Sequence, residues 1–246
     1  MRSAKMAELF ESLGINCEVL TGGYKAYRQQ LLNDVTALQR LIVLQGPTGS
    51  GKTDILHELQ ARGEQIIDLE GLANHRGSSF GGIGMEPQPS TQQFQNNLHE
   101  RIQQIEAGKR VWVESESFRI GKVHLPEPFW EAMNDASLLQ LDMPVELRAK
   151  RLVQDYGSLA KEALAEAIER LEDNFGKAKV NEAKELLQAG EGEALAQQLL
   201  LGYYDRRYRH SREKFKSQKA VILACHTANP AENAQQLIEL ANLQSL

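Results

Sequence analysis

The middle of the chain alternates short apolar runs with stretches in which apolar residues recur at helical spacing. The apolar runs are as short as typical strands, and they occupy residues 41–44, 65–69, 110–114, 138–142 and 220–225. Helical periodicity fills the intervals between most of them. This rhythm predicts an α/β fold, in which a parallel sheet is flanked by helices.

One long interval contains no strand pattern. Between residues 145 and 219, apolar stripes recur at helical spacing over 164–175, 180–187 and 195–203. Three helices inserted before the last strand are the simplest account, and we place this helical insert at about 145–217. After the last strand, Pro230 opens a closing helix.

The first residues predict a helix, a strand and a second helix. Met6, Leu9, Phe10 and Leu13 are spaced as on one helix face, and the short apolar run 17–20 predicts a strand. A further helical pattern leads into the first strand of the α/β unit. We therefore expect residues 1–36 to form a separate unit and residues 37–246 to form the α/β domain.

Composition narrows the class of protein. The chain has 246 residues, 41% hydrophobic and 25% charged, as in soluble globular proteins. A net charge of −5 argues against a wholly basic nucleic-acid coat but allows a local basic patch. No apolar run approaches the roughly 18 residues of a membrane span, so no membrane partner is expected.

The cysteines and the N-terminus indicate a cytoplasmic protein. Cys17 and Cys225 are the two cysteines, and they lack the C-x-x-C spacing of a zinc site or the number needed for a disulfide framework. The first residues lack the apolar core of a signal peptide.

The strongest motif follows the first predicted strand. Residues 46–53 match the phosphate-loop pattern G-x-x-x-x-G-K-[ST] at every fixed position. Backbone amides of such a loop point at phosphate oxygens, the lysine adds a positive charge and the threonine hydroxyl can bind Mg²⁺. The predicted phosphate-binding residues of the loop are Gly46, Thr48, Gly49, Ser50, Gly51, Lys52 and Thr53.

Two acids follow the strand at 110–114. In a parallel sheet, functional groups gather at the carboxyl ends of strands, so Glu114 and Glu116 should lie near the loop. Glu114 is a candidate second-sphere Mg²⁺ ligand alongside Thr53, or a water-positioning base, and Glu116 could take the other role. With Lys52 they form the predicted catalytic set. A solvated acidic turn is the alternative.

Two further segments could contact a ligand. Residues 68–82 combine acids and glycines with His75 and Arg76, which predicts a lid in which Arg76 grips a phosphate. His75 is either a proton donor or a hydrogen-bonding loop residue. Arg148 and Arg151 share a helix face and either reach over a nucleotide or form surface salt bridges.

A basic stretch near the C-terminal end mixes cations with aromatic rings. Cations neutralise phosphates and rings can stack on unpaired bases, a mixture suited to RNA. The alternative is that the rings belong to the core of the insert and the arginines extend to solvent. The predicted RNA-binding residues are Tyr204, Arg206, Arg207, Tyr208, Arg209 and Arg212.

Several short runs together carry a resemblance to a known family. They are 46–53, 68–73, 75–78, 114–117, 120–121, 125–126, 203–205 and Tyr208. These runs resemble the phosphate-loop domain of bacterial tRNA 2-selenouridine synthases, and the similarity extends over essentially the whole chain. The resemblance implies a P-loop NTPase-like sheet.

The resemblance also implies a two-step change to the wobble 2-thiouridine of tRNA. A geranyl group passes from geranyl diphosphate to sulfur, and selenium from selenophosphate then replaces the geranylated sulfur. The partners would be tRNA and these phosphorylated donors, with Mg²⁺, while the use of ATP or GTP stays open.

In that family a rhodanese-like domain precedes the phosphate-loop domain. Arg2-Ser3 resembles the pair that follows its catalytic cysteine, so residues 1–36 look like the C-terminal remnant of such a domain plus a linker helix. Cys17 does not match the catalytic position. We expect the missing rhodanese-like portion, in cis or in trans, to be needed for selenium transfer.

Two other functional classes remain open from the residues. A small-molecule kinase would bind ATP tightly without RNA, and a non-catalytic RNA-binding module would use the loop only structurally. A GTPase is disfavoured because no Asn-Lys-x-Asp motif occurs in the chain.

Overall fold

The computed structural model describes residues 2–35, 38, 40–212 and 220–246. Its centre is a five-stranded sheet with the strand order β2-β3-β1-β6-β7, and every neighbouring pair is parallel. The strands are β1 (Leu41–Gln45), β2 (Gln65–Ile67), β3 (Val111–Glu114), β6 (Ser137–Asp142) and β7 (Val221–Ala224). The predicted α/β class and all five strands are confirmed.

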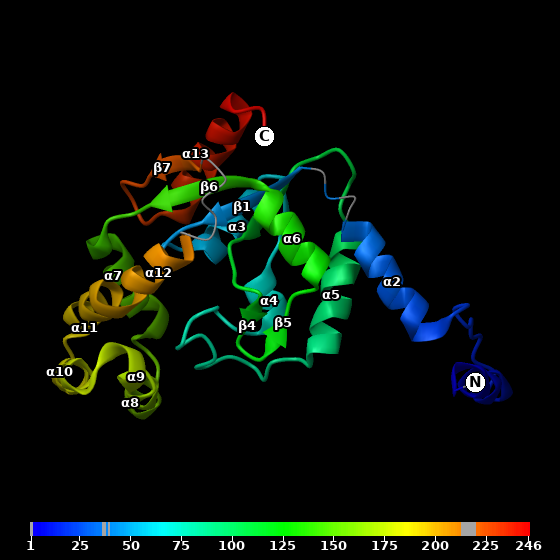
Figure 1. The fold of residues 1–246 in the computed structure, drawn as a ribbon, viewed down its shortest axis with the longest axis horizontal. Helices are drawn as coiled ribbons and strands as arrows, with labels where there is room; N and C mark the ends of the chain where they lie inside the picture. Colours follow the sequence, from blue (N-terminus) through cyan, green and yellow to red (C-terminus); the bar gives the residue numbers. More distant parts are fainter. Residues whose placement is uncertain (1, 36–37, 39, 213–219) are drawn as a thin grey trace.

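Helices cover both faces of the sheet, as predicted (Figure 1). Successive side chains of β1 point to opposite faces: Leu41 and Val43 enter one buried cluster, and Ile42 and Leu44 enter the other. Burial on both faces explains why this strand is a continuous apolar run. The covering helices are α5 (Thr91–Gln103) and α6 (Glu127–Asp135) on the first face, and α3 (Lys52–Ala61) and α13 (Pro230–Leu243) on the second.

The helical insert is more finely divided than the three predicted helices. Gly176 (φ 88°) separates α9 from α10, and Gly190 (φ 77°) ends α10, because these left-handed or unusual backbone angles interrupt a helix. Residues 213–217 of the predicted insert lie outside the described residues. The described segments are α7 (Val145–Tyr156), α8 (Lys161–Glu169), α9 (Glu172–Phe175), α10 (Lys177–Ala189), α11 (Gly192–Leu199), the π-helix η1 (Leu200–Tyr204) and α12 (Asp205–Arg212).

Two small elements interrupt the regions between the strands. The run predicted as a strand to residue 69 ends at Ile67, because the Asp68 carboxylate caps the short helix α4 (Leu69–Ala73) by accepting from Gly71 N at 2.7 Å. After β3, an antiparallel hairpin forms from β4 (Arg119–Ile120) and β5 (Val123–His124). Periodicity cannot detect strands this short.

The N-terminal segment contains α1 (Arg2–Ser12) and α2 (Gly23–Val35). The predicted strand at 17–20 is wrong: residues 15–20 have no regular structure and pair with no described strand. Helix α2 packs on α5, where Asp34 bonds His99 at 2.7 Å, whereas α1 projects from the body (Figure 1). Assignment of residues 1–36 to a rhodanese-like remnant stays a prediction. No described helix is long and apolar enough to span a membrane.

A partly buried ion pair fastens the insert to the loop that follows β1. The Arg148 guanidinium on α7 donates to both carboxylate oxygens of Asp205 on α12, each at 2.8 Å, and also to Thr48 O and Met143 O. Arg148 is 5% exposed. One side chain therefore joins both ends of the insert to the loop that follows β1.

We expect Asp205→Asn to lower the free energy of unfolding by roughly 3–5 kcal/mol, because Arg148 would stay buried without its counter-charge. Urea unfolding followed by circular dichroism measures the change. Lys109→Ala is the matched control: its ion pair with Glu106 is exposed, and we expect a change within about 0.5 kcal/mol. Equal effects of the two substitutions would contradict the role given to Asp205.

Candidate phosphate and nucleic-acid site

The glycine loop connects β1 to α3 in the geometry that a phosphate loop requires. Gly49 (φ 82°) and Gly51 (φ 75°) have left-handed backbone angles, and α3 begins at Lys52 directly after Gly51. Lys52 Nζ folds back to Gly46 O at 3.2 Å. The helix N-terminus and the lysine together present positive charge to the space above the loop.

A carboxylate that the sequence analysis did not select contacts the loop threonine. Thr53 Oγ1 donates to Glu70 Oε2 at 2.7 Å, and Glu70 lies in the first turn of α4. Glu114 is fully buried beneath this contact, where its Oε1 accepts from Glu70 N at 2.7 Å. Glu114 thus positions α4, and Glu70 is the acid beside Thr53.

The acids at the carboxyl ends of β2 and β3 lie close enough together to raise one another's pKa. Burial, followed by the Glu70 carboxylate, raises the pKa of Glu116 to about 8, despite the opposing charge of Lys52. Burial, then Asp68 and Glu70, also raises the pKa of Glu114 well above its usual range. Glu116 therefore keeps its proton near neutral pH, which makes the site less negative than its composition suggests.

The loop 74–82 closes over these acids. Gly77 (φ 63°) lies so close to Glu116 that a Cβ there would meet its carboxylate at 2.5 Å. Arg76 stacks its guanidinium on the Tyr156 ring at 5.1 Å, and its Nη1 has no hydrogen-bond partner in the protein. His75 packs beneath the loop and does not line the cavity described next.

The loop, the acids and the insert enclose a cavity of about 910 Å³. Of the two arginines on α7, Arg151 lines it: its guanidinium lies over Gly51 and pairs with Asp54, whereas Arg148 is used in the insert contact. The predicted residues that line the cavity are Gly46, Thr48, Gly49, Gly51, Lys52, Thr53, Arg76, Glu116, Tyr204, Arg207 and Tyr208.

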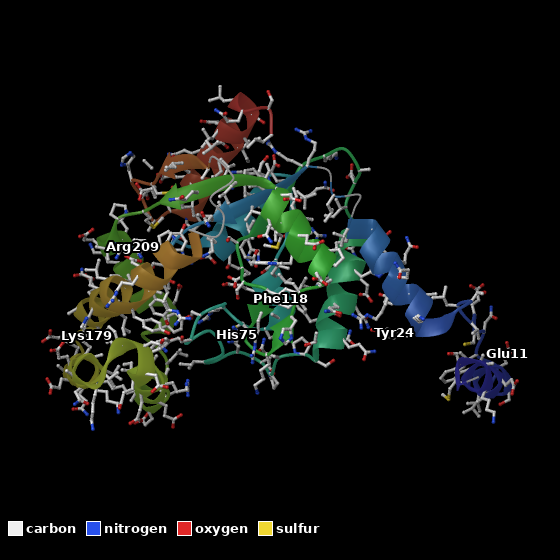
Figure 2. The ribbon with its side chains drawn as sticks, viewed as in Figure 1. Glu11, Tyr24, His75, Phe118, Lys179 and Arg209 are labelled. Carbon is white, nitrogen blue, oxygen red and sulfur yellow. The ribbon has the colours of Figure 1, made fainter. Side chains whose placement is uncertain are left out.

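The remaining predicted residues lie apart from this cavity. Ser50 is buried under the loop, and Arg206 and Arg209 are exposed on the outer side of α12, where Figure 2 labels Arg209. The side chain of Arg212 lies outside the described residues. The basic stretch therefore divides into a cavity-facing set and a solvent-facing set, which the sequence spacing had treated as one.

A second, mostly apolar cavity of about 610 Å³ lies among the helices of the insert. Leu164 on α8, Leu186 on α10 and Leu195 on α11 contribute to its lining. It shares a wall with the first cavity, and the residues that line both are Thr48, Ser78, Leu152, Tyr156 and Tyr204. A ligand with a charged head and an apolar tail could occupy the two together.

A metal ion at this site would need oxygens from a bound phosphorylated ligand as well as from the protein. Within the part of the chain that the structure describes, no group of three or more His, Cys, Asp or Glu side chains could hold a metal ion. Thr53 and Glu70 supply neighbouring oxygens, and Mg²⁺ is commonly held by one or two protein oxygens together with substrate phosphates. The residues present fit that second arrangement.

Several residues at the site were missed by sequence reasoning. Glu70 had a detectable signal, because it is an acid that follows a predicted strand. Its place beside the β3 acids depends on β2 lying next to β3, and the sequence does not give the strand order. Tyr156, Phe118 and Trp130 had no signal, because single aromatic residues in helices and turns are common. Only their approach in the folded chain places them at the cavity.

Comparisons with known proteins identify the family of the chain. The family described as "tRNA 2-selenouridine synthase AAA domain" matches residues 39–237. A tRNA 2-selenouridine synthase of Shewanella frigidimarina is 38% identical over 63% of this chain and 43% of its own length, and that of Nitrosomonas europaea is 36% identical over 63% and 41%. The chain spans less than half the length of these two relatives.

A longer alignment joins the chain to the synthase of Shewanella halifaxensis, with 31% identity over 93% of this chain and 70% of the relative. A solved tRNA delta(2)-isopentenylpyrophosphate transferase of Staphylococcus epidermidis covers 82% of this chain and 98% of its own, at 13% identity and a TM-score of 0.36, too distant a likeness to carry an argument. On the family match and the long alignment, the chain belongs to the tRNA 2-selenouridine synthase family.

Proposed function

We propose that this chain binds the phosphorylated donor and the tRNA in the conversion of wobble 2-thiouridine to 2-selenouridine, by way of a geranylated intermediate. Membership of the family supports action on tRNA. The observation that carries the geranyl step is the wall shared by the phosphate-loop cavity and the apolar cavity. Geranyl diphosphate has a charged head and an apolar tail that match these two spaces. Such an enzyme would act in the cytoplasm, where tRNA is found.

The reaction gives each part of the site a task. The thiouridine sulfur would attack the first carbon of the geranyl group, so that a C–S bond forms while the C–O bond to the diphosphate breaks and the N3 proton of the base passes to solvent. Negative charge then grows on the departing diphosphate, where Lys52, the loop amides and Arg76 would stabilise it. Mg²⁺, held by Thr53 and Glu70 with Glu114 behind them, would add to that stabilisation.

Selenium transfer would need a thiol that the cavity does not contain. Cys17 is half-buried in the N-terminal segment and Cys225 is buried after β7, and neither lines the cavity. We assign the missing thiol to a rhodanese-like portion that acts in cis or in trans, with selenophosphate as the selenium donor. Full selenation by the isolated 246-residue chain would overturn this assignment.

Lys52→Ala should weaken binding of geranyl diphosphate about 10–100-fold, because a charged hydrogen bond to the head group is lost. Isothermal titration calorimetry with Mg²⁺ measures the affinity, and the exposed Lys109→Ala should leave it unchanged. Titrations with selenophosphate and ATP, with and without thiolated tRNA, complete the experiment. A preference for ATP that does not respond to tRNA would favour a small-molecule kinase instead.

Leu164→Asn should weaken binding of geranyl diphosphate about tenfold while leaving inorganic diphosphate unaffected, because only the former places an apolar tail in the insert cavity. Titrating the same variant with geranyl diphosphate and with inorganic diphosphate separates the loss of contact with the geranyl tail from general damage to the fold. Leu243→Asn, at a position that is 81% exposed, is the control. Equal losses for both ligands would contradict the proposed location of the tail.

The free energy of unfolding should fall as pH rises from about 4.5 to 8. The pKa of Glu116 is raised to about 8 in the fold, so between these values the folded chain keeps a proton that the unfolded chain has released. Glu116→Gln should flatten this part of the stability profile in urea unfolding. Glu106→Gln, at an exposed site, should keep the slope of the parent chain, and an unchanged slope in Glu116→Gln would refute the raised pKa.

A further inference from the structure

An aromatic ring is exposed inside the phosphate-loop cavity, on a wall formed by the β3–β4 connection and α6. Phe118 is 39% exposed and lines the cavity together with Trp130. Its ring centroid lies 6.3 Å from that of Trp130 and 5.8 Å from that of His124. Figure 2 labels Phe118 near the centre of the molecule, above the β4–β5 hairpin. None of the roles assigned so far uses this cluster.

The chain holds Phe118 in place on both sides. Its carbonyl oxygen accepts from Leu125 N at 2.9 Å, and the Ser117 hydroxyl donates to Arg119 O at 2.5 Å. The ring packs edge-on against Trp130, which supports one side of it. Its exposure is therefore built into the hairpin and is not the result of a loose turn.

The surroundings of Phe118 select the kind of group that could cover it. Ser117 and Arg119 precede and follow Phe118 in the chain and line the same cavity, as do Arg207 and Tyr208 from α12. An unpaired nucleobase has a flat face for the ring and polar edges for these neighbours, and its phosphates suit the arginines. A prenyl tail lacks polar edges, and the apolar cavity of the insert fits it better.

We propose that Phe118, supported by Trp130, is the platform on which the target uridine of tRNA stacks when it enters the phosphate-loop cavity. This inference rests on the proposed function, because it assumes that tRNA is the substrate. It adds a base-binding residue from the β3–β4 connection to the residues that α12 contributes to the cavity. The base then has aromatic and cationic groups from two separate elements around it, and the phosphate loop borders the same space.

The test measures the affinity of the chain for an RNA hairpin that carries an unpaired 2-thiouridine in its loop, and for the same hairpin with an abasic site at that position. Phe118→Ala should weaken binding of the uridine hairpin about tenfold, which corresponds to about 1.4 kcal/mol, and should leave the abasic hairpin unaffected. Phe118→Tyr should retain the affinity because it keeps the flat face. Phe10→Ala is the matched control, since Phe10 is exposed to a similar extent (37%) on α1.

Removing the base and the Phe118 ring, separately and together, isolates the contact between them. If Phe118→Ala weakens both hairpins equally, or neither, the platform is refuted while binding of tRNA stands. The platform is also refuted if the Phe118→Leu variant binds the uridine hairpin with the affinity of the parent chain, because a large side chain without an aromatic ring would then suffice. If the parent chain binds neither hairpin, the proposed tRNA function fails, and the platform with it.

Discussion

The contact of Arg148 with Asp205 and Thr48 is the constraint on which the site depends. It joins the start of the helical insert, its last described helix and the glycine loop through one buried guanidinium. Because the insert is held against the loop, the same side chains can line both the polar and the apolar cavity. Without that attachment the glycine loop would lack the wall that the insert provides, and the apolar cavity would not adjoin it.

Burial, as well as ion pairing, limits the negative charge of the carboxylates within the site. Glu70, Glu114 and Glu116 gather at the carboxyl ends of β2 and β3, close to a loop suited to anions. Burial, followed by the charges of the neighbouring acids, raises the pKa of both Glu114 and Glu116, so these groups hold a proton more readily than a free carboxyl does. Under the proposed function, this would allow a site with several carboxylates to accept a diphosphate, with Glu70 beside Thr53 as an oxygen donor for Mg²⁺.

The sequence predicted the sheet well and the site only in part. Four of the strands were detectable because they are largely buried and therefore apolar, and β7 was detectable as a short apolar run although Ile222 is 55% exposed. The glycine loop was detectable because its backbone angles demand glycine. The two arginines of α7 looked equivalent by spacing, yet Arg148 is used in packing and Arg151 lies over Gly51. The strand expected at 17–20 failed because an apolar run becomes a strand only where another strand can pair with it.

The sequence by itself determined the α/β class, the position of the phosphate loop and the resemblance to the synthase family, because these depend on local patterns and on motifs of fixed spacing. Tertiary structure alone decided that Glu70 is the acid beside Thr53, that Phe118 is exposed in the cavity and that an apolar space adjoins the phosphate loop. The reason is physical. Strand order, the docking of the insert and the pairing of distant side chains are long-range contacts, and no short segment of the chain specifies them.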